Sequence, residues 1–108
     1  MKSDVIKEIQ GQQIEILEFI LKRIDYQLEL SLKISCNNEI YLLVFYNVSN
    51  INMDALSMPL QIAGFEITSN KNLGYDKSVS YRIHDFEENK FSFYCEDFET
   101  FSLDEVTE

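Results

Sequence analysis

Residues 84 to 99, HDFEENKFSFYCEDFE, gather the residue types from which catalytic and metal sites are built. The stretch holds the only histidine of the chain, one of its two cysteines and six carboxylates. These groups can ligate a metal ion, supply a thiol nucleophile, or act as a paired acid and base. Each of these roles needs side chains that converge in space. The elements that carry the residues therefore decide which role is possible.

Two alternating runs in this region predict a β-hairpin. The segments VSYRIHDF (79–86) and KFSFYCEDF (90–98) alternate apolar and polar residues, as half-buried strands do, and residues 79–86 and 90–96 are expected to pair. A three-residue loop between them places Ile83 opposite Phe93. The residues that then share one apolar face are Val79, Tyr81, Ile83, Phe91, Phe93 and Cys95.

The same register separates the histidine from the cysteine. His84 falls opposite Ser92 on the other face, beside Arg82, where we expect a solvent-facing histidine. Cys95 points the opposite way, and Cys36 ends a second apolar alternation, so both thiols are expected to be buried and free. No phosphate-binding loop, nucleophile elbow or zinc motif occurs. We predict a non-enzymatic protein with no catalytic, cofactor-binding or metal-binding residue, and no cofactor.

The strongest strand signal lies upstream, in YQLELSLKIS. Tyr26 begins an alternation whose apolar members continue to Ile34. Asn37 and Asn38 follow, and asparagine tolerates the positive φ of a tight turn. The next run, IYLLVFYNV, is continuously apolar, which predicts a strand covered on both faces. We expect this hairpin to form the centre of the sheet.

The remaining segments complete a single domain over residues 1–108. The run QQIEILEFILKRI fits either a strand or a helix, and its β-branched content favours a strand. A single helical turn is expected over Met53–Ser57, and one strand over LQIAGFEIT, with Gly64 at a bulge or a close backbone approach. Residues 1–4 and 102–108 are expected to fray. The predicted fold is mainly β, an antiparallel sandwich or half-open barrel of six to eight strands with at most one or two short helical turns.

The net charge of −10 limits the partners. Residues 51–108 contain twelve acids and four bases, a net charge of −8. Such a surface repels nucleic acid and attracts a basic protein. A negative charge that only keeps the chain soluble is the alternative. With no signal peptide and no apolar stretch long enough to span a bilayer, we expect a cytoplasmic protein that binds neither nucleic acid nor membrane.

The segments FYNVSNINMD, SMPLQIAGFEI and YRIHDFEENKFSFYC resemble a group of small bacterial proteins. Some of these are assigned as immunity proteins of polymorphic or contact-dependent toxin systems. The resemblance covers roughly residues 40–96. It implies a cytoplasmic inhibitor that occludes a toxin, and it carries no active-site residues.

The charge and the resemblance together predict an acidic protein-binding module that covers a basic toxin surface. The residues predicted to contact the partner are Asp85, Phe86, Glu87, Glu88, Tyr94, Glu96, Asp97 and Glu99. The alternative is a non-catalytic binder of small molecules in the mouth of a half-barrel, walled by Tyr41, Tyr46, Tyr75 or Tyr81. The oligomeric state is left open.

Overall fold

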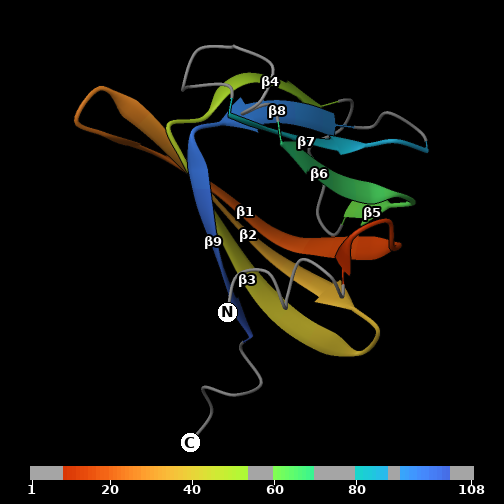
Figure 1. Cartoon of the computed structure of the whole chain (residues 1–108). Helices are drawn as coiled ribbons and strands as arrows, with labels where there is room; N and C mark the ends of the chain where they lie inside the picture. Colours follow the sequence, from red (N-terminus) through yellow and green to blue (C-terminus); the bar gives the residue numbers. More distant parts are fainter. Residues whose placement is uncertain (1–8, 54–59, 70–79, 88–90, 103–108) are drawn as a thin grey trace, which may run out of the picture.

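The computed structural model describes residues 9–53, 60–69, 80–87 and 91–102. These residues form nine strands in two antiparallel sheets that face each other as a sandwich (Figure 1). The predicted class is confirmed, although nine strands exceed the predicted six to eight. None of the described residues forms a helix long and apolar enough to cross a membrane.

The larger sheet has five strands in the order β5-β1-β2-β3-β9. Their bounds are β1 Ile14–Ile24, β2 Gln27–Cys36, β3 Glu39–Tyr46, β5 Leu60–Ile62 and β9 Asp97–Ser102. The smaller sheet has the order β4-β8-β7-β6. Its strands are β4 Ser49–Met53, β6 Phe65–Ser69, β7 Tyr81–Asp85 and β8 Phe91–Cys95.

The β2–β3 hairpin follows the sequence pattern closely. Leu30 and Leu32 on β2 are fully buried, and Leu32 pairs with Leu43 on β3. Asn37 and Asn38 form the turn with φ values of 54° and 67°, as their tolerance of positive φ predicts. The alternation of apolar side chains therefore identified both the strand and its inward face.

Strand β1 confirms the favoured interpretation of the N-terminal run, and a bulge explains its ambiguity. The register with β2 shifts between Ile16 and Glu18. Before the shift Ile16 faces the core opposite Ile34, and after it Phe19 takes the inward position opposite Leu32. Because a bulge inserts one residue, the inward phase changes from even to odd positions. When the two-residue alternation of apolar side chains shifts in this way, the sequence resembles the apolar pattern of a helix.

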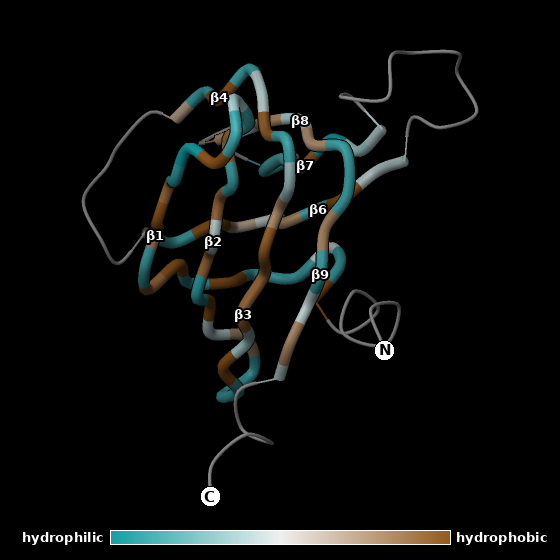
Figure 2. The backbone as a smooth tube through the Cα atoms, turned by 90° about the vertical axis from the view of Figure 1, so that its left-hand side faces the viewer, coloured by the Kyte–Doolittle hydropathy of each residue, from teal (hydrophilic) through white to brown (hydrophobic). Residues whose placement is uncertain are grey.

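Strand β3 is covered on one face only, which corrects the prediction for its apolar run. Phe45 is fully buried, whereas Leu42 and Val44 on the other face are half-buried. Figure 2 views the five-stranded sheet across β1, β2, β3 and β9, and none of the described strands packs on this outer face. The outer neighbours of Val44 and Leu42 are Glu99 and Phe101 of β9.

The segment LQIAGFEIT is two strands and not one. Strand β5 pairs with β1 in the larger sheet, and β6 pairs with β7 in the smaller sheet. Gly64 lies at the crossing, where an added Cβ would sit 2.5 Å from Cγ of Glu87 and 2.8 Å from Cε2 of Phe86. The expected close approach is thus present, but it is a contact with the β7–β8 turn.

Residues 49–60, which show no alternation, contain a strand. The chain forms β4 over Ser49–Met53. The sequence predicts a helical turn over Met53–Ser57. Met53 is the last residue of β4, and residues 54–57 lie outside the described residues. Strand β9 is also additional to the prediction, since its residues were expected only to follow β8.

Aromatic side chains join the two sheets. The ring of Phe45 meets that of Phe93 edge to face, with centroids 5.0 Å apart. Phe98 of β9 meets Tyr81 of β7 at 4.9 Å in the same geometry. Such pairs add to the free energy of burial by about 0.5–1.5 kcal/mol each. Cys36 and Cys95 are buried, as predicted, and neither forms a disulfide bond.

We expect the substitution Asp85→Ala to destabilise the β7–β8 turn. Asp85 is 1% exposed, and its Oδ1 accepts hydrogen bonds from the backbone N–H groups of Gly64 at 3.2 Å and Glu87 at 3.1 Å. Removing this buried acceptor should lower the free energy of unfolding by about 1–3 kcal/mol, measured by urea denaturation. Asp85→Asn keeps an acceptor oxygen and should lose less. Equal stability of Asp85→Ala and the parent chain would contradict this role.

Candidate functional site

The residues predicted to contact a partner lie at two ends of the β7–β8 hairpin, and those at the second end continue onto β9 of the larger sheet. Phe86 and Glu87 are exposed in the turn after β7, whereas Glu96 follows the far end of β8. The four residue steps along β7 correspond to about 13 Å. Asp85 is buried beneath the first end, and Glu88 lies outside the described residues. The structure therefore divides the predicted patch.

His84 occupies the predicted register but not the predicted environment. It lies opposite Ser92, as expected, yet it is only 9% exposed. The expectation of a solvent-facing histidine is wrong because β6 flanks the hairpin and places Glu66 beside it, with Oε1 3.3 Å from His84 Nε2. Burial, followed by the charge of Arg82, lowers the pKa of His84 below its ordinary value of 6.5.

The arrangement around His84 offers no catalytic or metal site. Cys95 faces the core and His84 the opposite sheet face, so the two do not form a thiol–imidazole pair. Within the described ranges, no three His, Cys, Asp or Glu side chains cluster closely enough to hold a metal ion. Among the described residues of 84–99, the histidine and the cysteine are therefore held apart on opposite faces of the sheet.

The second end of the patch belongs to a larger group that we name the acidic corner. It comprises Glu29, Tyr46, Asn47, Glu96, Asp97 and Glu99. The sheet register places Tyr46 between Glu29 of β2 and Asp97 of β9. The Tyr46 hydroxyl donates a hydrogen bond to Glu99 Oε1 at 2.8 Å. Three strands thus bring these groups together.

The corner forms where the chain passes between the sheets. Asn47 has a φ of 54°, a conformation that asparagine tolerates, and it leads the chain out of β3. Its side-chain amide donates to Glu96 Oε1 at 3.1 Å, and the Glu96 backbone N–H donates to the Tyr46 carbonyl at 2.9 Å. These two hydrogen bonds join the segment that leads from β3 to β4 to the segment that leads from β8 to β9.

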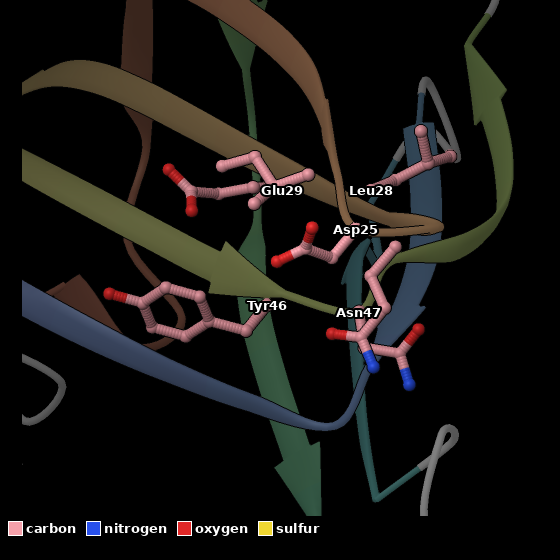
Figure 3. A pocket seen from close by; sticks show the side chains of 7 residues that line it. Asp25, Leu28, Glu29, Tyr46 and Asn47 are labelled. Carbon is pink, nitrogen blue, oxygen red and sulfur yellow. The ribbon is translucent and has the colours of Figure 1, made fainter.

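A small hollow adjoins the corner (Figure 3). Its volume is about 160 Å³, and it is half open to solvent. The lining residues are Ile24, Asp25, Gln27, Leu28, Glu29, Tyr46 and Asn47. It lies beside the β1–β2 turn and not between the sheets. Its walls mix aliphatic carbon with carboxylates.

The tyrosines proposed for a small-molecule pocket are dispersed. Tyr41 is 3% exposed within the core, and Tyr81 packs against Phe98. Tyr46 lines the hollow, and Tyr75 lies outside the described residues. The described tyrosines therefore do not wall one deep pocket.

Electrostatics distinguishes Tyr46 within the corner. Its hydrogen bond to Glu99, together with partial burial and the negative charges of Glu99, Glu29 and Asp97, raises its pKa from 10.0 to about 12. The register places one cation, Lys22 of β1, opposite Glu29. The corner is a negative surface around a phenol, suited to attract a cationic side chain.

Sequence reasoning placed Glu96, Asp97 and Glu99 in the predicted contact set, named Tyr46 only as a wall of the alternative pocket, and did not name Glu29 or Asn47. A signal for Tyr46 was present, because Phe45 and Tyr46 must point to opposite faces of a strand. The assumption that β3 is covered on both faces concealed it. The placement of Glu29 and Asp97 on either side of Tyr46 required the order of β2, β3 and β9.

We expect Tyr46→Phe to change the alkaline stability of the chain. Because the folded pKa of about 12 lies above the ordinary value of 10.0, the Tyr46 contribution is present below pH 10 and is lost as pH rises toward 12. Tyr46→Phe should lower the free energy of unfolding by up to about 1 kcal/mol below pH 10. Urea denaturation of both chains should show this difference shrinking between pH 10 and 12. A difference that stays constant over that range would refute the assignment.

Comparison with known proteins places the chain in a family. No curated protein and no solved structure matches it. A family model described as Immunity protein PIM8 matches residues 3–101. This match confirms the resemblance to immunity proteins and extends it beyond residues 40–96, to nearly the whole chain. The chain is therefore a member of the immunity protein family PIM8.

Proposed function

We propose that the chain neutralises a toxin by binding a basic surface of that toxin with the acidic corner. Membership of an immunity protein family implies a toxin partner. The observation that carries the choice of surface is the Tyr46–Glu99 hydrogen bond, with Glu29 and Asp97 on either side. The corner blocks the toxin by covering that surface, without a catalytic step, in the cytoplasm of the producing bacterium.

The chemistry of the corner favours an arginine- or lysine-bearing partner. Carboxylates raise the association rate with a positively charged protein and suppress binding of acidic ones. A phenol beside them adds a rigid aromatic contact of the type that dominates interface energies. The outer face of the larger sheet continues from the corner through Val44 and Leu42 to Phe101. A partner seated on the corner would also cover this apolar strip, in which Leu42 and Val44 are half-buried and Phe101 is exposed.

The other end of the original patch is a second candidate contact. Phe86 is 48% exposed and lies beside the exposed Glu87. Tyr94 is half-buried on the outer face of β8, opposite Arg82. These side chains lack the convergence of several strands that distinguishes the corner. We therefore give the corner the principal role.

The experiment is a comparison of two triple variants with equal charge. One converts Glu29, Asp97 and Glu99 to amides, and the control converts Glu15, Glu18 and Glu39 to amides. Each changes the net charge from −10 to −7, since three acids are removed. The probe is the toxin domain encoded beside the gene of this chain. Association rate and Kd are measured at two salt concentrations, together with survival of cells that express the toxin.

We expect the corner variant to associate about 10-fold or more slowly than the parent chain, with a weaker salt dependence and lost protection. The control should stay close to the parent chain. An equal loss in both variants would assign the effect to net charge and reject the corner. Glu87→Gln tests the second contact in the same assay. A parent chain that neither binds nor protects would reject the proposed function.

A further inference from the structure

The tip of the β1–β2 hairpin projects from the sandwich as an apolar arm (Figure 1). We define the arm as residues 20–27. Strand β5 pairs with β1 only over Ile14–Ile16, so the arm extends beyond that pairing. Four large apolar side chains of the arm are exposed: Ile20 at 45%, Leu21 at 43%, Ile24 at 47% and Tyr26 at 92%. Exposed apolar side chains on a projection of this kind mark an interaction surface more often than they stabilise the fold.

Tyr26 is held in a conformation that its side chain disfavours. Ile24 pairs with Gln27, so Asp25 and Tyr26 form a two-residue turn, with φ values of 50° and 70°. Such turns favour asparagine and glycine, and a bulky residue in the left-handed region is strained. The equivalent turn between β2 and β3 uses two asparagines at similar φ values.

The fold itself gains little from this tyrosine. At 92% exposure its ring buries almost no surface, and its described ring contact is with the Arg23 guanidinium, 5.9 Å from the ring centroid. The backbone strain at Tyr26 is not offset by burial of its ring, and this points to a role outside the fold. Tyrosine is also enriched among the residues that anchor protein interfaces.

We propose that the arm is a second anchor for the toxin, with Tyr26 as its central contact. This inference rests on the proposed function, because the arm and the acidic corner share the walls of one hollow. Ile24, Asp25 and Gln27 of the arm line the hollow together with Glu29, Tyr46 and Asn47 of the corner. A partner that enters the hollow touches both surfaces.

The hollow indicates the chemistry of the toxin surface. An arginine side chain would lay its aliphatic stem against Ile24 and Leu28, and would direct its guanidinium toward Asp25 and Glu29. Tyr26 and Ile20, which shares the outer face of β1 with Ile24, would then meet apolar surface around that arginine. The occupant is thus a toxin face on which an arginine emerges from an apolar patch.

The test separates stability from binding. Tyr26→Asn should raise the urea midpoint of unfolding, since asparagine tolerates the turn, and should weaken binding of the adjacent-gene toxin domain about 30-fold. Tyr26→Phe keeps the ring and should retain the parent affinity. Asn38→Gly, in the matched turn between β2 and β3, should leave the affinity unchanged.

Three results would overturn the arm contact. Unchanged affinity of Tyr26→Asn, while the corner amides still slow association, would reject the arm and leave the proposed function standing. A less stable Tyr26→Asn chain would show that the tyrosine serves the fold. Sedimentation of the chain alone would identify a second copy as the occupant if Tyr26→Asn dissociated a dimer. Absence of toxin binding by the parent chain would instead remove both proposals together.

Discussion

The edge-to-face contact between Phe45 and Phe93 is the constraint on which the rest of the molecule depends. It joins the centres of the two sheets, and Phe98 and Tyr81 extend it toward the crossing of the chain. Because neighbouring residues of a strand point to opposite faces, burying Phe45 forces Tyr46 outward. The exposed chemistry of the protein is thus a consequence of how its aromatic core is filled.

The acidic corner is held rigidly by the same strands that carry the aromatic core. Tyr46 ends a central strand, and the carbonyl of Tyr46 accepts a hydrogen bond from the backbone of Glu96 at the return crossing. Carboxylates from β2 and β9 are therefore held on a framework and not on a free loop. A binding surface placed in this way loses little conformational entropy on association. Mutual repulsion of its charges is the cost, and the basic partner that we propose would relieve it.

In the proposed complex the arm would complement the corner, because the two surfaces would make different contributions to binding. Charges act over distance and chiefly accelerate encounter, while buried aromatic and aliphatic contacts slow dissociation. The contrast between the turns of the larger sheet fits this division. Asn37 and Asn38 suit their φ values and serve the fold, whereas Tyr26 occupies a similar conformation at a cost and remains in solvent.

The sequence by itself determined the features that depend on the two-residue alternation of a strand or on the residues of a turn. The inward phase of β2, the pairing of Ile83 with Phe93 and the turn at Asn37 and Asn38 were all predictable, since each depends on residues close along the chain.

Tertiary structure alone decided where distant strands meet. It divided LQIAGFEIT between two sheets, made a strand of residues 97–102, buried His84 beside Glu66 and placed Tyr46 between Glu29 and Asp97. Alternation states which face a side chain occupies but not which strand lies beside it. Strand order is set by packing of the whole core, and the candidate site depends on that order.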